Sequence, residues 1–263
     1  MAQQRQELNN IMSRFKNVLL ILSLTLLSAC ATIPGGTSKD DPFESYNRAM
    51  FSFNDGLDEH IVKPIAEGYD AVVPSPVKTG VSNFFSNIGD IFVILNDLLQ
   101  FKFSQAAQDT GRFLINSTFG LYGLFDVATP MGLTKNHEDF GQTLATWGVA
   151  SGPYIVLPFY GPRTLRSTGG LIVETILAPI NEIKNQDTFY ATFALETIDA
   201  RYNLLDESRI VDQAALDEYS FVRDAYLQHR KNLIYDGNPP EDKTSAPPKS
   251  SAEDLELEKL LGL

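Results

Sequence analysis

Three consecutive residues, His137, Glu138 and Asp139, have side chains that could bind a metal ion or transfer protons. A zinc hydrolase of the His-Glu-x-x-His type would place a second histidine nearby on the same helix, and the sequence has none there. A serine hydrolase would show a Gly-x-Ser-x-Gly turn, which is also missing. The three residues are therefore interpreted as a solvated loop. The sequence predicts a protein that is not an enzyme and has no metal site and no cofactor.

Cys30 is the only cysteine, and its position indicates covalent lipid chemistry. Arg14 and Lys16 precede an apolar run over residues 18–27, which is too short to span a bilayer but is typical of a secretory signal. The following Leu-Ser-Ala-Cys sequence resembles the bacterial lipobox, in which cleavage precedes the cysteine and the cysteine is then acylated. We expect Cys30 to be a lipid attachment site. The alternative is an ordinary signal peptide with a chance cysteine.

This lipobox divides the N-terminal part of the chain. Residues 1–29 are predicted to be the signal peptide, and residues 30–40 a lipidated tether. Two or more acyl chains anchor a protein stably, because each buried methylene contributes about 0.8 kcal/mol. By resemblance to sorting in Gram-negative lipoproteins, Ala31 favours the outer membrane, whereas aspartate would favour retention at the inner membrane. The expected location is the periplasmic side of the outer membrane.

The charge balance excludes several partners. The whole chain carries −12, and removal of residues 1–29, which carry a net +2, leaves −14. Nucleic acid requires a basic face, and anionic lipid headgroups attract polybasic patches. The sequence therefore predicts no nucleic-acid partner, and membrane contact has to come from apolar surface and from the anchor.

Two segments of the N-terminal half indicate amphipathic helices that would position the other elements. Residues 41–53 carry apolar side chains at spacings of three and four, the period of one helical face. Asn54, Asp55 and Gly56 follow, a turn-forming cluster that we expect to interrupt this helix. Residues 77–103 have a broad apolar face with the same period. That segment is either a core helix or, in a lipid-anchored protein, a helix lying in the membrane interface.

The segment from Phe140 to Pro162 has no charged residue but contains four glycines and three prolines. These breaks exclude one continuous helix and leave only short pieces. Irregular backbone at membrane depth has to be buried in protein or line a polar cavity, because its polar groups would otherwise be unsatisfied. We therefore expect the segment to lie inside a membrane-embedded protein, beside a channel or groove. The residues assigned to that path are Phe140, Trp147, Gly152, Pro153, Tyr154 and Pro158.

The C-terminal part is predicted to contain two further amphipathic helices, over residues 187–205 and 210–234. Residues 236–263 are rich in proline, serine and acidic residues and are predicted to be a disordered tail. The tail ends in a short amphipathic stretch with Leu257, Leu260 and Leu261. It is either a solvated extension without a role or a tethered peptide that docks as a helix in a groove.

Four long motifs resemble, in order, the signature stretches of the MlaA (VacJ) family of outer-membrane lipoproteins. They are ESYNRAMFSFNDGLD, RFLINSTFGLYGLFDVA, EDFGQTLATWGVASGPYIVLPFYGPRTLR and VRDAYLQHR. The resemblance implies an all-α fold, a ring-shaped bundle of amphipathic helices that is embedded in one membrane leaflet around a central amphipathic channel. Residues 41–235 would form this helical domain.

The resemblance also implies a function and partners. Family members move mislocalised phospholipid from the outer leaflet through the channel to a periplasmic lipid carrier, MlaC, and associate with a trimeric outer-membrane porin. The region of Phe53, Asn54, Asp55 and Gly56 would act as a hinge that gates the channel, and the C-terminal leucines would dock the carrier. The alternatives are a structural lipoprotein that scaffolds an envelope complex and a lipid hydrolase.

Overall fold

The computed structural model describes residues 41–240, except for the side chains of residues 210 and 212–214. Its elements are α2 (Glu44–Leu57), a π-helical turn (Asp58–Val62), α3 (Lys63–Val72), α4 (Ser75–Leu99), α5 (Phe103–Thr118), a 3-10 turn (Thr129–Met131), α6 (Phe140–Thr146), β1 (Tyr154–Leu157), β2 (Gly161–Thr164), α7 (Leu165–Leu177), a second 3-10 turn (Pro179–Glu182), α8 (Gln186–Tyr202), α9 (Leu205–Ala214) and α10 (Glu218–Ile234). Cys30 and the tail leucines Leu257, Leu260 and Leu261 lie outside the described residues.

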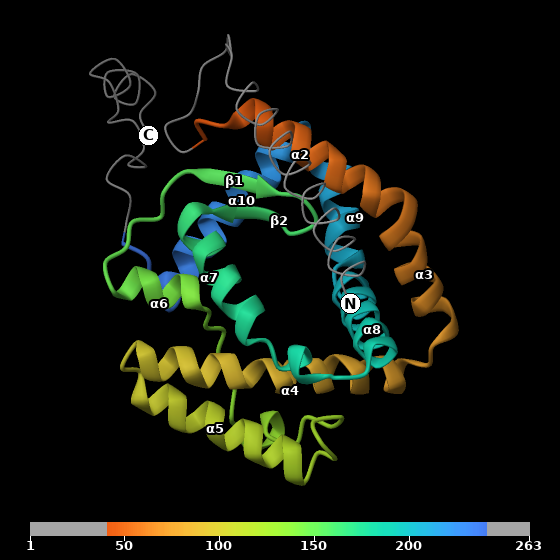
Figure 1. The fold of residues 1–263 in the computed structure, drawn as a ribbon, viewed down its shortest axis with the longest axis vertical. Helices are drawn as coiled ribbons and strands as arrows, with labels where there is room; N and C mark the ends of the chain where they lie inside the picture. The colour runs from red at the N-terminus through yellow and green to blue at the C-terminus, as the bar shows by residue number, and fades with distance from the viewer. Residues whose placement is uncertain (1–40, 241–263) are drawn as a thin grey trace, which may run out of the picture.

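The helices follow one another round a ring, which Figure 1 shows face-on. Helix α4 forms one side and carries α5 on its outer surface; α4 also packs against α6 and α8. Helix α3 packs against α8, and α6 packs against α7. The expected helical ring is confirmed. The only β-structure among the described residues is an antiparallel hairpin of β1 and β2, in which Tyr154 lies opposite Thr164.

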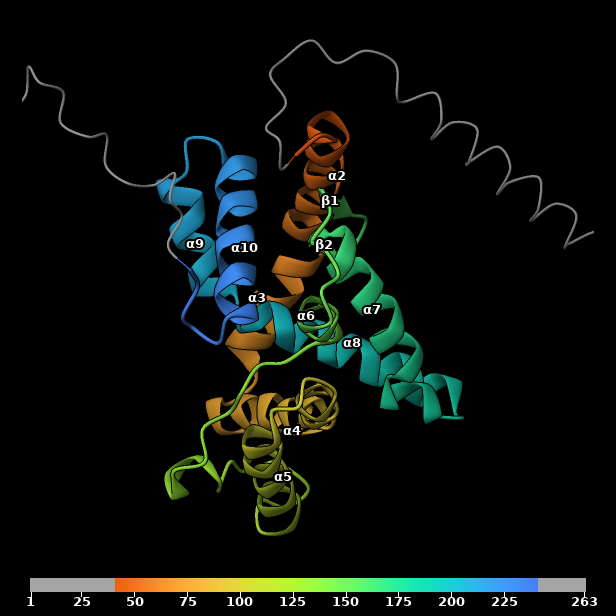
Figure 2. The same ribbon diagram turned by 90° about the vertical axis from the view of Figure 1, so that its left-hand side faces the viewer.

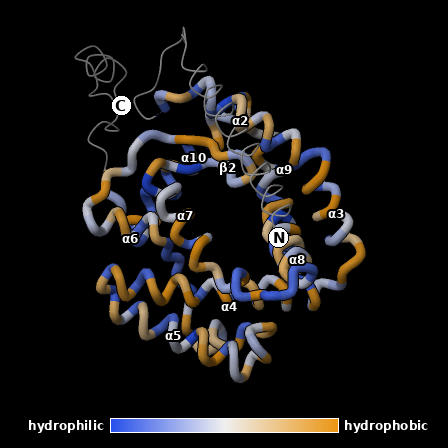
Figure 3. The backbone as a smooth tube through the Cα atoms, in the orientation of Figure 1, coloured by the Kyte–Doolittle hydropathy of each residue, from blue (hydrophilic) through white to orange (hydrophobic). Residues whose placement is uncertain are grey.

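Buried and exposed residues are distributed in reverse of the usual pattern for a soluble protein. Among the described residues, eight hydrophobic but eighteen polar or charged side chains are buried. Large apolar side chains stand on the surface instead, and the tube in Figure 3 carries hydrophobic residues on every side of the ring. Examples are Val72, Phe119, Tyr122, Phe159 and Ile176. None of the described helices is both long and apolar enough to cross a membrane.

A small core joins the hairpin to α2 and α10. Tyr154, Val156 and Tyr219 are almost fully buried there. Asn47 on α2 provides the polar connection: its Nδ2 donates to the Tyr154 carbonyl at 3.1 Å, and its Oδ1 accepts from the Val156 N–H at 2.8 Å. Its Nδ2 also donates to Asp41 at 2.7 Å. Asp41 is thus a buried acceptor, and α2 begins three residues after it.

The expected break at Asn54, Asp55 and Gly56 is wrong, because α2 runs through all three residues. The Asn54 side chain does not turn back to its own backbone. It reaches the hairpin instead, donating to the Leu157 carbonyl at 2.9 Å and accepting from the Phe159 N–H at 2.8 Å. The irregularity lies one turn later, in the π-helical turn, and single π turns often mark functional sites.

Helix α4 fits neither expected reading completely. All of its buried residues except Val93 are polar and include Asn87, Asp90 and Asp97, whereas Leu95 and Leu98 are exposed. Polar groups of α4 are therefore buried, while several of its apolar side chains are exposed. This arrangement differs from that of a conventional core helix.

The segment of residues 140–162 consists of short pieces, as expected: helix α6, a loop and the hairpin. One further expectation needs correction. The helix expected over residues 210–234 is two helices, α9 and α10, separated at residues 215–217. Residue 217 is extended and precedes the first residue of α10, so the chain changes direction there.

Candidate functional site

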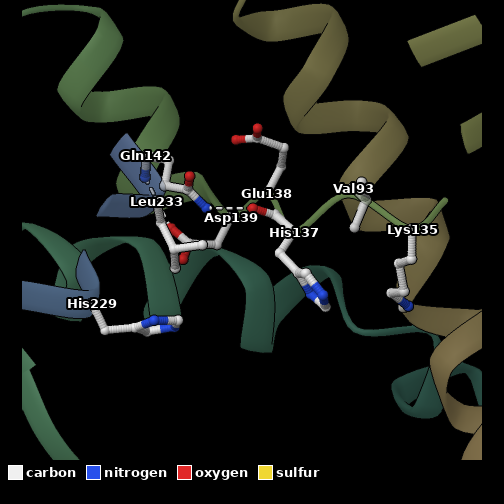
Figure 4. A pocket seen from close by; sticks show the side chains of 9 residues that line it. Val93, Lys135, His137, Glu138, Asp139, Gln142, His229 and Leu233 are labelled. Carbon is white, nitrogen blue, oxygen red and sulfur yellow. Dashed lines mark hydrogen bonds between the residues drawn. The ribbon is translucent and has the colours of Figure 1, made fainter. Parts of the chain in front are cut away.

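A polar cavity of about 440 Å³ lies between α4, α10 and the segment that leads into α6 (Figure 4). Its volume falls in the range of small-molecule sites, roughly 300–1,000 Å³. We call it the polar pocket. Its lining residues are Gly89, Val93, Lys135, His137, Glu138, Asp139, Gln142, His229 and Leu233.

Glu138 forms one fixed wall of the polar pocket. Its carboxylate is buried and accepts from Gln100 at 2.7 Å, from Gln105 at 2.9 Å and from the Lys102 ammonium at 2.7 Å. The interpretation of His137–Asp139 as a solvated loop is therefore wrong for Glu138. Its negative charge is already balanced by Lys102, so Glu138 exerts little net electrostatic attraction or repulsion on a ligand.

Asp139 is also bound within the protein. It caps the N-terminus of α6, where its Oδ1 accepts from the Gln142 N–H at 2.8 Å, and it forms an ion pair with Arg230 of α10. Burial alone would raise the pKa of Asp139, but the hydrogen bond and charge of Arg230 outweigh burial and lower the pKa. Asp139 thus remains ionised and ties α6 to α10.

Lys135 balances a third carboxylate at the other end of the polar pocket. Its ammonium lies 2.7 Å from Oδ1 of Asp90, a residue of α4 that is 1% exposed. It also donates to the Ser86 carbonyl at 2.8 Å and to the Ser86 hydroxyl at 2.6 Å. Burial raises the pKa of Asp90, and the Lys135 contact opposes that shift.

The two imidazoles of the polar pocket remain available to a ligand. His137 and His229 are solvent-accessible, and neither side chain has a hydrogen-bond partner within residues 41–240. Burial lowers the pKa of His137, and the charges of Lys135 and His229 lower it further. A neutral imidazole offers one N–H donor and one acceptor. The polar pocket can therefore donate hydrogen bonds to an oxygen-rich group.

A second cavity, of about 420 Å³, lies between α4, the 3-10 turn after α7, and α8. We call it the apolar pocket. Aromatic and aliphatic side chains make up most of its wall. The lining residues are Phe84, Phe85, Ile88, Gly89, Phe92, Ala178, Pro179, Ile180, Ile183, Thr192 and Glu196. Gly89 lines both cavities, so the polar and apolar pockets meet at this position on α4.

The residues expected to line a lipid path lie outside both pockets. Trp147 is exposed and donates from Nε1 to the Leu99 carbonyl at 3.1 Å, and its ring lies 5.9 Å from that of Phe140. Gly152 has φ +67°, and a Cβ there would lie 2.8 Å from the Cβ of Leu165. Tyr154 is fully buried in the small core. The contacts of Tyr154 therefore indicate that its side chain stabilises the small core.

Pro153 and Pro158 flank the first strand. The Pro153 carbonyl accepts from the Leu165 N–H at 3.1 Å and holds the start of α7 against the hairpin. Pro158 is half-buried and immediately precedes Phe159, which has φ +67°. Both prolines thus shape the hairpin. A role in a lipid path stays a proposal for them.

Sequence reasoning missed Gly89, Lys135 and His229. His137 and His229 are far apart in the sequence, and the sequence gives no sign that α10 brings them to one cavity. The one available signal was scarcity, since the chain has only three histidines. In residues 41–240 no three His, Cys, Asp or Glu side chains are grouped so as to hold a metal ion.

Comparison with known proteins places this geometry in context. The family described as MlaA lipoprotein matches residues 39–233. An "Intermembrane phospholipid transport system lipoprotein MlaA" of Shigella flexneri is 38% identical over 226 residues, which cover 83% of this chain and 88% of the relative. The protein of the same name from Escherichia coli K12 is 37% identical over the same shares.

A relative of undescribed function from Rickettsia felis is 37% identical over 195 residues, 74% of this chain and 78% of its own. A solved structure, described as the structural basis for maintenance of bacterial outer membrane lipid asymmetry, superposes with a TM-score of 0.64 and 34% identity. It covers 76% of this chain and 100% of its own.

Proposed function

Because the chain belongs to the MlaA lipoprotein family, we propose that it removes mislocalised phospholipid from the outer leaflet of the outer membrane. The lipid passes through the ring and is handed to a periplasmic carrier. The chain is a phospholipid-transport lipoprotein that maintains lipid asymmetry of the outer membrane. The route through the ring and the transfer to the carrier are the proposal.

The reversed distribution of side chains carries this proposal. Apolar surface exposed to water costs about 25 cal/mol per Å². The exposed aromatic and aliphatic side chains on α3, α5 and α7 would therefore be stabilised by an acyl-chain environment. Polar and charged side chains line the polar pocket, where they can meet a lipid headgroup. We infer that the ring lies in one leaflet, with its interior as the amphipathic path.

Transfer of lipid tests the proposal against the two alternatives. Full-length lipidated protein is reconstituted in vesicles that contain labelled phospholipid, and labelled lipid appearing on purified carrier is measured over time. Transfer of intact phospholipid supports transport. Absence of transfer from correctly inserted protein would favour a scaffold, and release of lysolipid would favour a hydrolase. In cells, deletion of the protein should increase phospholipid in the outer leaflet.

Cys30 is proposed to anchor the protein on the periplasmic side of the outer membrane. Cys30→Ala should block acylation and leave the precursor uncleaved, because the sulfur is the acceptor of the diacylglycerol group. Incorporation of radioactive fatty acid measures acylation. The matched control Ser28→Gly keeps the cysteine and should incorporate label normally. Equal incorporation into Cys30→Ala would remove Cys30 as the attachment site.

The partners are proposed to be phospholipid, a trimeric outer-membrane porin and the carrier MlaC. We propose that Leu257, Leu260 and Leu261 dock on the carrier, because a tether raises the local concentration of a weak binding peptide. Removal of Glu253–Leu263 should reduce carrier recovery in a pull-down and leave porin association intact. A chain with the three leucines changed to serine separates the leucine side chains from tail length. Equal carrier recovery with all three proteins would show that the tail has no docking role.

A further inference from the structure

The polar and apolar pockets meet at Gly89, and we propose that together they hold one glycerophospholipid: its phosphodiester between His137 and His229, and an acyl chain in the apolar pocket. This inference rests on the proposed transport function and adds the site, the orientation of the lipid and the point at which its passage can be blocked.

The charges of the polar pocket are consistent with a phosphodiester. Each of the three carboxylates near it already has a cationic partner: Asp90 has Lys135, Glu138 has Lys102 and Asp139 has Arg230. The carboxylates are thus held by the protein and do not project unpaired charge into the cavity. Among the titratable side chains that line the polar pocket, the two imidazoles are left to face a ligand.

Imidazoles suit this ligand because each N–H can donate to a phosphate oxygen. Figure 4 shows His137 and His229 extending from different elements toward the same side of the cavity. Approach of a phosphate would also oppose the lowering of the His137 pKa, since a nearby negative charge favours the protonated form. The bound headgroup would thereby strengthen its own electrostatic attraction.

The apolar pocket accounts for the other half of the ligand. Phe84, Phe85, Ile88 and Phe92 form its α4 wall, and Ile180 and Ile183 face them from the turn after α7. A water-soluble phosphate compound would gain no binding free energy from this surface. An acyl chain would gain binding free energy there, because its contact removes apolar area of both partners from water.

The arrangement of the helices gives the lipid a direction. Figure 2 shows α9 and α10 on one side of the ring, while α7 leads to the other. The polar pocket borders α10, and the apolar pocket borders the turn after α7. A lipid that occupies both therefore lies across the α4 side of the ring, with its headgroup toward α10.

Gly89 is the residue that lines both pockets. A Cβ at Gly89 would meet no atom within 4 Å, so the space beside it is open. Alanine fits that space without filling it. Leucine would project into the junction of the two pockets, and we expect it to separate them.

The experiment uses the full-length lipidated protein with p-benzoylphenylalanine in place of Ile180, in cells whose phospholipids carry radioactive phosphate. Irradiation should join labelled lipid to the protein. Gly89→Leu should lower this labelling about tenfold, and the His137→Ala/His229→Ala double variant about fivefold or more, since lost hydrogen bonds weaken retention. Gly68→Leu should label normally. Gly68 is a matched control, because it is an exposed helical glycine whose Cβ would also meet nothing within 4 Å.

The outcomes separate this inference from the proposed function. Thermal unfolding of each variant identifies any loss of fold. If the parent protein transfers lipid and Gly89→Leu labels and transfers equally, the two-pocket site is wrong while transport stands. Undiminished labelling of the folded double-histidine variant also overturns the site. If the parent protein neither labels nor transfers, the transport function itself fails.

Discussion

Deletion of Phe53 and Asn54 is expected to hold the ring open, so that phospholipid accumulates in the outer leaflet even when the intact protein is also present. The hinge assignment for residues 53–56 is retained as a proposal, on a different structural basis. These residues do not break α2. Phe53 and Asn54 join α2 to the hairpin.

Three contacts make this connection. The rings of Phe53 and Phe159 lie edge to face, with centroids 5.5 Å apart. The Asn54 side chain bonds to the backbone of Leu157 and of Phe159. Phe159 has φ +67°, a conformation that costs energy for a non-glycine residue and persists only when its surroundings hold it. Without Phe53 and Asn54, the hairpin turn loses the contacts that hold it.

The deletion also makes two contacts at opposite ends of α2 geometrically incompatible. Asn47 connects the first half of α2 to the hairpin, and Asp58, just after α2, forms an ion pair at 2.8 Å with Arg201 of α8. Removing two residues from a helix turns one end by about 200° relative to the other and shortens the helix by about 3 Å. Both attachments cannot then be kept, so the ring has to deform between α2 and α8.

The readouts are outer-leaflet phospholipid, measured by its accessibility to an external phospholipase, and growth in detergent with EDTA. Asn54→Ala removes two of the contacts without shortening the helix and should give a weaker effect in the same direction. Deletion of Gly237 and Asn238, two exposed residues after α10, serves as the matched control. Unchanged outer-leaflet phospholipid in cells that express the Phe53–Asn54 deletion beside the intact protein would contradict the gating role.

Local periodicity was sufficient to predict most helices of the ring. The stripe of residues 43–53 and the long apolar face after residue 77 both correspond to helices, α2 and α4. Turn-forming residues were less reliable, because their preferred bonds were satisfied elsewhere. Asn54 shows the reason: its side chain finds backbone partners about a hundred residues away in the sequence.

The candidate site was the harder part to predict. An uncharged segment rich in glycine and proline indicated where irregular backbone lies, but not that Tyr154 would be buried in a core with Tyr219. The polar pocket combines α4, α10 and the segment before α6. Its histidines acquire a common role only through tertiary packing. Sequence spacing carries no information about that proximity.

The buried seam between α4 and α5 leads to the second prediction. Asp97 of α4 is fully buried and finds no hydrogen-bond donor among the described residues. Asp109 of α5, also fully buried, accepts from the Asn136 side chain at 2.8 Å. Burial raises the pKa of Asp97 to about 7, and the nearby negative charge of Asp109 contributes to the rise. Asp97 therefore keeps its proton in the folded protein well above the usual range of a carboxylic acid.

This raised pKa makes folding depend on pH in a defined direction. Below about pH 4 the carboxyl is protonated in both folded and unfolded chains, and its full stabilising contribution is present. As the pH rises toward 7, the unfolded chain releases the proton while folded Asp97 retains it, so stability falls. Once folded Asp97 ionises, the loss is complete. We expect the thermal unfolding midpoint of the protein in neutral detergent to fall from about pH 5 to about pH 8.

Asp97→Asn is expected to flatten this fall, because the amide stays neutral and can donate a hydrogen bond toward Asp109. At about pH 8 the variant should exceed the parent protein in stability by roughly 2 kcal/mol, the scale of an unsatisfied buried polar group. Asp206→Asn is the matched control: Asp206 pairs only at the surface with Arg209, and such pairs contribute about 0–1 kcal/mol. An Asp97→Asn profile that falls as steeply as that of the parent protein would show that another group causes the pH dependence. A rise in the midpoint for Asp97→Asn alone would identify the α4–α5 seam as its source.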